Sequence, residues 1–361
     1  MTALFVSILL IIVILFYFNN KSLIKSKVEF YLYLSCLWVL SGLSIFYDSY
    51  LVVCIAVLLS FFILFFIFKS KKYKIVKLIL FAALITSFLI TLFIMLLISV
   101  KSFDFFEKVD ISEFLFCLKW NHNINAEKSG CFGIAPLLVG TLLITIVAML
   151  VVVPLGLFSA VYISEYASKR IRYTVNTALQ VLSAIPTVVY GYFAIVFLSF
   201  AVKQMASFFG LSVHSESALV AGLSIGIMIL PFFISLVEDA IRSVPKSLRY
   251  GFMALGATPA ETIRHIIIPY AMPTILSAVL LSISRAIGET MIVLMAVGIN
   301  ANLTFNPLHS VTTITVQIAT LLTGDQDFSS PQTLAAYALS LALFIITWML
   351  NAFALFIMRR K

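Results

Sequence analysis

The stretch 134-IAPLLVGTLLITIVAMLVVVPLGLFSAVYIS-164 runs for 31 residues without a charged side chain. An α-helix rises about 1.5 Å per residue, so about 20 apolar residues cross the hydrocarbon core of a bilayer. The stretch therefore predicts a transmembrane helix. Eight other apolar runs predict further spans, at 3–18, 30–47, 50–68, 76–100, 174–202, 217–241, 272–298 and 334–358. Together they predict an all-α polytopic membrane protein with about nine transmembrane helices.

The composition of the whole chain agrees with this fold class. Of its 361 residues, 62% are hydrophobic and 11% are charged, and the mean hydropathy is +1.14, which excludes an ordinary soluble domain. The net charge of +9 comes from short basic clusters between apolar runs, so no nucleic-acid binding is expected. The chain has no Gly-Lys dipeptide, and its four histidines lack metal-site spacing. We therefore expect neither ATP hydrolysis by this chain nor a metal site.

The basic residues predict the orientation of the helices. Of 24 Lys and Arg residues, 18 fall on alternate connections, which the positive-inside rule assigns to the cytoplasm: 19–29, 69–77, 168–173, 242–271 and 359–361. The C-terminus is therefore expected inside. The first 18 residues lack a basic leader, so the first helix is expected to stay uncleaved with its N-terminus outside. The connections at 101–133, 203–216 and 299–333 are expected on the outer side.

Cysteines and prolines add local expectations. Cys117 and Cys131 lie in the longest outer connection, where an oxidising compartment favours a disulfide between them, although two free thiols fit the sequence as well. Three prolines fall inside predicted spans, where a missing backbone hydrogen bond kinks a helix: Pro154, Pro186 and Pro231. Such kinks suit helices that enclose a transport pathway and move during transport. They also occur as purely structural features.

The cytoplasmic connection 242–271 predicts a short helical hairpin. Thr258 and Glu261 have the spacing of a capping box and Pro259 stands between them, so a helix is expected to begin there and to end at Pro269. Gly256 supplies the turn that precedes this helix. The apolar residues of the first hairpin helix recur at helical spacing: Leu248, Phe252 and Leu255. The hairpin either packs against the membrane surface or docks onto a cytoplasmic subunit.

A charged pair interrupts the apolar run at 272–298. Arg285 and Glu289 are four residues apart and are expected on one helix face, with Ser282 adjoining. A charge at the centre of a membrane helix costs about 2.5–3.5 kcal/mol, so both groups are expected to face protein or water. The pair is then either a buried salt bridge that joins helices or a site for an anion, since guanidinium matches the oxygens of phosphate.

Four stretches resemble ABC-importer permeases, and most closely those of the phosphate-specific, PstC-type family. They are 154-PLGLFSAVYISEYAS-168, 184-AIPTVVYGYF-193, 255-LGATPAETIRHIIIP-269 and 284-SRAIGETMIVLMAVG-298. The resemblance covers roughly 76–358, expected to form a six-helix permease core, and leaves 1–75 as a three-helix membrane extension. It implies that the hairpin couples to an ATPase through Leu255, Gly256, Ala257, Thr258 and Glu261. Where the family usually has Glu-Ala-Ala, this chain has Tyr250-Gly251-Phe252.

The resemblance also implies a function and partners. It implies a non-hydrolytic permease subunit of an ATP-driven phosphate importer in a bacterial inner membrane, with Arg285, Glu289 and Ser282 along the anion path. The expected partners are a second homologous permease, a dimer of ATPase subunits that holds ATP and magnesium, a periplasmic phosphate-binding protein and membrane lipid; no cofactor is expected on this chain. Three alternatives remain: a sulfate or molybdate permease, an ion-coupled carrier with a proton-linked Arg285–Glu289 site, and a non-transporting membrane sensor that contacts a signalling kinase through its N-terminal helices.

Overall fold

The computed structural model describes residues 72–120, 132–208, 210, 216–298, 301, 303–323 and 330–359. The three helices expected in the extension at 1–75 lie outside these residues. The chain divides into two compact units, 1–95 and 96–361. Helix α4 (Lys72–Phe106) begins in the first unit, and its last residues belong to the second.

All regular elements of the described chain are helices, apart from one isolated β-bridge. Three of them, labelled η, are short π-helical turns that continue into neighbouring α-helices. After α4 the elements follow in this order: α5 (Ile111–Phe116), α6 (Ala135–Val161), η1 (Tyr162–Tyr166), α7 (Lys169–Ser183), α8 (Thr187–Phe193), η2 (Ala194–Leu198), α9 (Ser199–Phe208), α10 (Ala218–Arg242), α11 (Lys246–Ala254), α12 (Pro259–Thr262), η3 (Ile263–Ile267), α13 (Ile268–Ile287), α14 (Met291–Ala296), α15 (Ile314–Leu322) and α16 (Pro331–Arg359).

Six helical runs in the described chain are long and apolar enough to cross a membrane. Each of them overlaps one of the apolar runs predicted after residue 75. The prediction of an all-α polytopic membrane protein is therefore confirmed. The six runs are Ala83–Phe106, Ala135–Tyr166, Thr187–Phe208, Ala218–Arg242, Pro259–Ile287 and Pro331–Met358.

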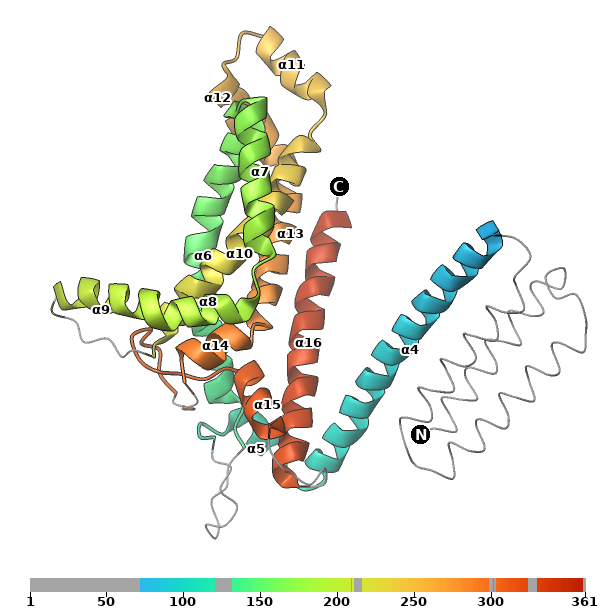
Figure 1. Cartoon of the computed structure of the whole chain (residues 1–361), viewed down its shortest axis with the longest axis vertical. Helices are drawn as coiled ribbons and strands as arrows, with labels where there is room; N and C mark the ends of the chain where they lie inside the picture. The colour runs from blue at the N-terminus through green and yellow to red at the C-terminus, as the bar shows by residue number, and fades with distance from the viewer. Residues whose placement is uncertain are drawn as a thin grey trace, which may run out of the picture. The chain divides into compact units, whose positions relative to one another are not determined.

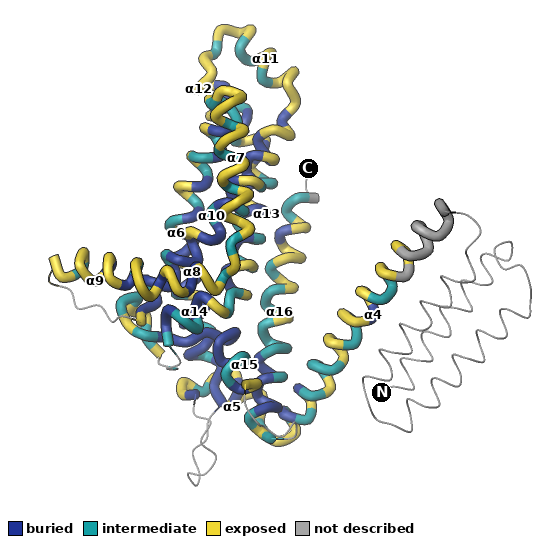
Figure 2. The backbone as a smooth tube through the Cα atoms, viewed as in Figure 1, coloured by how far each residue is buried: buried dark blue, intermediate teal, exposed yellow. Residues whose placement is uncertain are grey.

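Helix α10 forms the core of the second unit. It packs against α6, α13 and α7, and Figure 2 shows that most of its length is buried. Glycines allow α6 and α10 to approach closely: a Cβ at Gly222 would lie 2.6 Å from Val147, and one at Gly156 would collide with the ring of Phe233. A larger side chain at either position would push the two helices apart.

The two predicted sides of the membrane correspond to opposite ends of the second unit. Helices α11 and α12, from the connection assigned to the cytoplasm, lie at one end, and α5 and α15 lie at the other (Figure 1). Near α5, the ring of Phe105 makes edge-to-face contacts with those of Phe114 and Phe132, and Trp120 forms the β-bridge with Phe132. Cys117 is disulfide-bonded. Its predicted partner, Cys131, lies outside the described residues.

Two of the three prolines that are expected inside membrane spans lie inside helices, and the third does not. Pro154 lies within α6 and Pro231 within α10. Pro186 is instead the N-cap of α8, with an extended ψ of 140°, so the predicted span at 174–202 is wrong in its first half. A proline disfavours helical geometry in the residue before it and cannot donate a backbone hydrogen bond. The chain therefore breaks here, and α7 becomes a separate helix without buried residues.

Pro269 does not end the second helix of the hairpin, contrary to the sequence prediction. The helical run continues from α12 through η3 into α13, and its span is Pro259–Ile287 rather than 272–298. In η3 the N–H of Ile268 donates to the carbonyl of Ile263, five residues earlier, and Pro269 follows at the start of α13. The wider π turn accommodates a residue without an N–H, so the helix passes through the proline.

Candidate functional site

The turn of the hairpin has the geometry that the sequence predicts. Helix α11 ends at Ala254, and Gly256 adopts a φ of +92° between α11 and α12. A side chain at this position would meet no atom within 4 Å. The requirement for glycine is therefore conformational rather than steric, because residues with a Cβ rarely adopt a positive φ.

The predicted capping box begins the second hairpin helix. Thr258 Oγ1 accepts a hydrogen bond from the backbone N–H of Glu261 (3.3 Å), and Glu261 Oε2 accepts one from the N–H of Thr258 (2.8 Å). The Thr258 hydroxyl also donates to Glu261 Oε2 at 2.9 Å. Pro259 occupies the first helical turn. These contacts fix the direction in which the helix leaves the turn.

The hairpin presents apolar side chains outward. No side chain of α11 is buried (Figure 2), and Leu255 at the turn is 85% exposed. Leu248 and Tyr250 are exposed as well. These exposed apolar side chains are available for contact with a membrane surface or with another protein.

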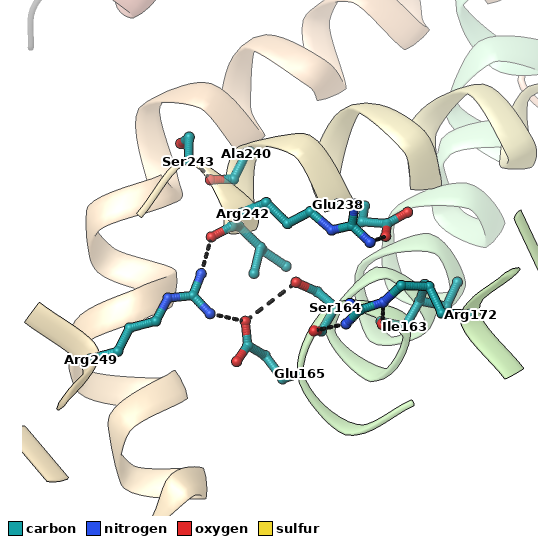
Figure 3. Close-up of polar contacts among 10 residues, drawn as sticks. Ile163, Ser164, Glu165, Arg172, Glu238, Ala240, Arg242, Ser243 and Arg249 are labelled. Atoms are coloured by element: carbon teal, nitrogen blue, oxygen red, sulfur yellow. Dashed lines mark hydrogen bonds and ion pairs between the residues drawn. The ribbon is translucent and has the colours of Figure 1, made fainter. Parts of the chain in front are cut away.

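One arginine attaches α11 to the rest of the second unit (Figure 3). Arg249 Nη1 lies 2.5 Å from Glu165 Oε1 in η1, and Arg249 Nη2 donates to the carbonyl of Ile241 near the end of α10, also at 2.5 Å. The side chains of Arg249 and Glu165 are only 17% and 16% exposed. The pair is not among the residues predicted from the sequence, because its members are 84 residues apart and no local spacing signals the contact.

The turn η1 is held from a second direction as well. Arg172 of α7 donates through Nε to the carbonyl of Ile163 (2.8 Å) and through Nη2 to that of Ser164 (Figure 3). Ser164 Oγ donates to Glu165 Oε1 at 3.3 Å. The Glu165 carboxylate, which pairs with Arg249, is thus itself oriented by Ser164.

Arg285 lies in the last turn of α13 and is exposed. Its guanidinium carbon lies 4.9 Å from the ring centroid of Phe232 on α10, which is a cation–π contact. One turn earlier Ser282 is fully buried, and its hydroxyl has no hydrogen-bond partner within the described chain.

Glu289 does not share a helix face with Arg285, contrary to the sequence prediction. Helix α13 ends at Ile287, and Glu289 lies in the break before α14. Its Oε1 accepts a hydrogen bond from the N–H of Ile292 (3.3 Å), and its carbonyl accepts one from Thr315 Oγ1 (2.9 Å). Arg285 and Glu289, both described, form no ion pair with each other. The helix ends here because these contacts satisfy backbone groups that a continuous helix would pair internally.

Within the described residues, no cluster of three or more His, Cys, Asp or Glu side chains has the arrangement of a metal site. The chemically distinctive groups are therefore the hairpin, its Arg249 attachment, and the Arg285–Glu289 break.

The fold is that of a subunit from a solved membrane transporter. A chain of the bacterial alginate ABC transporter, in complex with an alginate pentasaccharide-bound periplasmic protein, aligns over 81% of this chain and 98% of its own length, with a TM-score of 0.53 and 18% identity. At this level of identity the likeness establishes the fold. Together with the six membrane-spanning runs, the fold is that of a polytopic membrane protein.

The sequence places the chain in a family. Residues 152–360 match the family "Binding-protein-dependent transport system inner membrane component", and the chain belongs to it. It is 33% identical to the probable ABC transporter permease protein YqgH of Bacillus subtilis over 66% of this chain and 74% of that protein. It is 30% identical to the phosphate transport system permease protein PstC of Pasteurella multocida, over 72% of this chain and 85% of that protein.

A partial similarity extends to a second kind of permease. The phosphate transport system permease protein PstA 1 of Mycobacterium tuberculosis is 33% identical over 53% of this chain and 59% of that protein. The chain is thus a multi-pass membrane permease with relatives among both PstC and PstA proteins.

Proposed function

We propose that this chain is the transmembrane permease subunit of an ATP-driven phosphate importer. The observation that carries the proposal is the exposed hairpin, in which the Gly256 turn and the Thr258–Glu261 capping box present apolar residues away from the membrane helices. Such a surface suits docking onto a cytoplasmic ATPase. The choice of phosphate rests on the relatives named PstC.

The proposed assembly rests on the family to which the chain belongs. A dimer of ATPase subunits that binds ATP and magnesium docks beneath the hairpin, a second permease completes the translocation path, and a periplasmic phosphate-binding protein delivers the substrate. This chain binds no cofactor and hydrolyses no ATP. The hairpin and the C-terminus face the cytoplasm, in agreement with the distribution of basic residues, and the N-terminus faces the periplasm.

Arg285 is the proposed cationic contact for phosphate. Its guanidinium offers donors that match phosphate oxygens, and its exposure in the isolated chain leaves it accessible to an anion or to the second permease. Ser282, with its unpartnered buried hydroxyl, lies one turn away. Glu289 either balances the charge of Arg285 between transport events or accepts a hydrogen bond from protonated phosphate. The second role disfavours sulfate, which carries no proton at neutral pH.

Reconstituted transport tests this function. Vesicles would contain the full chain, the second permease, the ATPase and the phosphate-binding protein, and uptake of radiolabelled phosphate would be measured with and without ATP and with sulfate as competitor. We expect ATP-dependent uptake of phosphate that sulfate does not reduce. Inhibition by sulfate would reassign the anion, and uptake that follows a proton gradient without the ATPase would identify an ion-coupled carrier.

A further inference from the structure

The position of α11 needs an explanation, because apolar burial does not supply one. None of its side chains is buried. A hairpin that is displaced by another protein nevertheless has to transmit that displacement to the membrane helices. The turn and the capping box fix the angle between α11 and α12. They join α11 to the second helix of the same hairpin, where α11 packs against α12 and η3.

Arg249 connects α11 to two groups of the core. Its guanidinium contacts the Glu165 carboxylate in η1, which continues α6, and the Ile241 carbonyl in the last turn of α10 (Figure 3). The last carbonyls of a helix lack partners within it and carry partial negative charge, so a cation at this end is favourable. Because the pair is mostly shielded from solvent, removing one partner leaves the other charge poorly solvated and costs more than the loss of a typical surface ion pair.

Glu165 and the η1 turn that carries it are held in place by further hydrogen bonds. Glu165 accepts from the Ser164 hydroxyl, and Arg172 binds two carbonyls of η1. A displacement of α11 is therefore transmitted to η1 rather than absorbed by a loose carboxylate. Helices α6 and α10 pack closely on each other, so they respond together.

We propose that Arg249 is the positioning residue that links the hairpin to α6 and α10, and that its ion pair with Glu165 couples ATPase movement to transport. The inference rests on the proposed function and deepens it by naming the contact that carries the motion. The pair holds α11, while α12 acts directly on α13 through the continuous helix. The hairpin thus moves three core helices at once.

The test compares the full chain with Arg249→Gln, Glu165→Gln and the double variant, each assembled with the second permease, the ATPase and the binding protein. The quantity measured is the number of phosphate ions moved per ATP hydrolysed by isolated complexes, because free ATPase subunits are then absent and a smaller number of complexes lowers both rates together. Arg242→Gln is the matched control: Arg242 pairs with Glu238 within α10, also at 2.5 Å, and does not join the hairpin to another element.

Each single variant is expected to lower the ratio about 5- to 150-fold, the usual range of coupling between sites. The double variant should be no worse than the more severe single one, because the two residues act as one unit. Arg242→Gln should keep the wild-type ratio. Unchanged ratios in the single variants, or losses that multiply in the double variant, would overturn the inference.

A second measurement separates this inference from the transport function. Hydrogen exchange of the α11 amides is followed in the full chain in lipid nanodiscs without partners. Arg249→Gln is expected to accelerate exchange in α11 relative to the wild type, and Arg242→Gln is not. If the wild-type complex moves no phosphate, the proposed function fails, but the exchange rates still decide whether Arg249 holds α11. Equal exchange in the wild type, Arg249→Gln and Arg242→Gln would refute that role.

Discussion

Replacement of Gly256 by alanine tests the conformational reason for the hairpin turn. The φ of Gly256 is +92°, and a left-handed backbone costs an L-residue about 1–2 kcal/mol. No atom lies within 4 Å of an added Cβ, so the methyl group itself adds no steric term. The hairpin of Gly256→Ala should therefore open more readily by about 1–2 kcal/mol, which raises hydrogen exchange of its amides about 5- to 30-fold.

Gly251 provides the matched control for this substitution. It lies inside α11, and an added Cβ there also meets no atom within 4 Å. Because its backbone is helical, alanine should stabilise α11 by up to about 1 kcal/mol. The two substitutions are chemically identical and should have opposite effects on exchange. Gly256→Asn should recover part of the loss, since asparagine tolerates positive φ better than alanine.

The assay is hydrogen exchange by mass spectrometry over residues 246–262, with ATP-dependent phosphate uptake measured on the same variants. Gly256→Ala should show faster exchange and lower uptake, and Gly251→Ala should show neither. Wild-type exchange in Gly256→Ala would refute the reasoning, because it would mean that the turn does not depend on the positive φ.

Three further predictions concern other parts of the chain. Arg285→Gln should lower phosphate uptake about 100-fold, as does loss of a preorganised anion-stabilising donor. Arg170→Gln, at an exposed arginine of α7, should not lower it, and equal uptake in both variants would remove Arg285 from the proposed anion path. Gly140→Ala should lower the thermal unfolding midpoint through about 1–3 kcal/mol of overpacking, because its Cβ would collide with the backbone carbonyl of Thr312; an unchanged midpoint would contradict that close contact. Peptide mapping without reductant should recover Cys117 linked to Cys131, and recovery of Cys131 as an alkylated thiol would exclude the pairing.

Much of the fold is predictable because its signals are local. Hydrophobic length alone predicts a run that overlaps each of the six spans of the described chain, although the bounds of two of them are wrong. Residue spacing alone locates the capping box at Thr258 and the turn at Gly256. In each case the physical cause lies within a few residues of the feature. Neither a distant contact nor a partner is needed to produce it.

The wrong predictions of helix ends arise where the backbone hydrogen-bonding pattern of a helix changes. Pro269 is normally a reason to end a helix, but the π turn η3 removes the need for its N–H. Glu289 is expected on the face of Arg285 only if the helix continues, and contacts from Ile292 and Thr315 stabilise the break instead. Thr315 lies 26 residues further along the chain, so periodicity in the segment around Glu289 cannot reveal the end of the helix.

The break between Arg285 and Glu289 separates the two charges of the proposed anion site. On one continuous helix, the two charges would neutralise each other and leave little field for an anion. In the structure Glu289 accepts a hydrogen bond from the N–H of Ile292 at the start of α14, where a carboxylate is favourable. Within the described residues, Arg285 contacts the aromatic face of Phe232 and forms no ion pair. The guanidinium therefore keeps hydrogen-bond donors available, and Glu289→Gln should reduce uptake less than Arg285→Gln. Equal losses in the two variants would instead indicate that Glu289 touches the substrate.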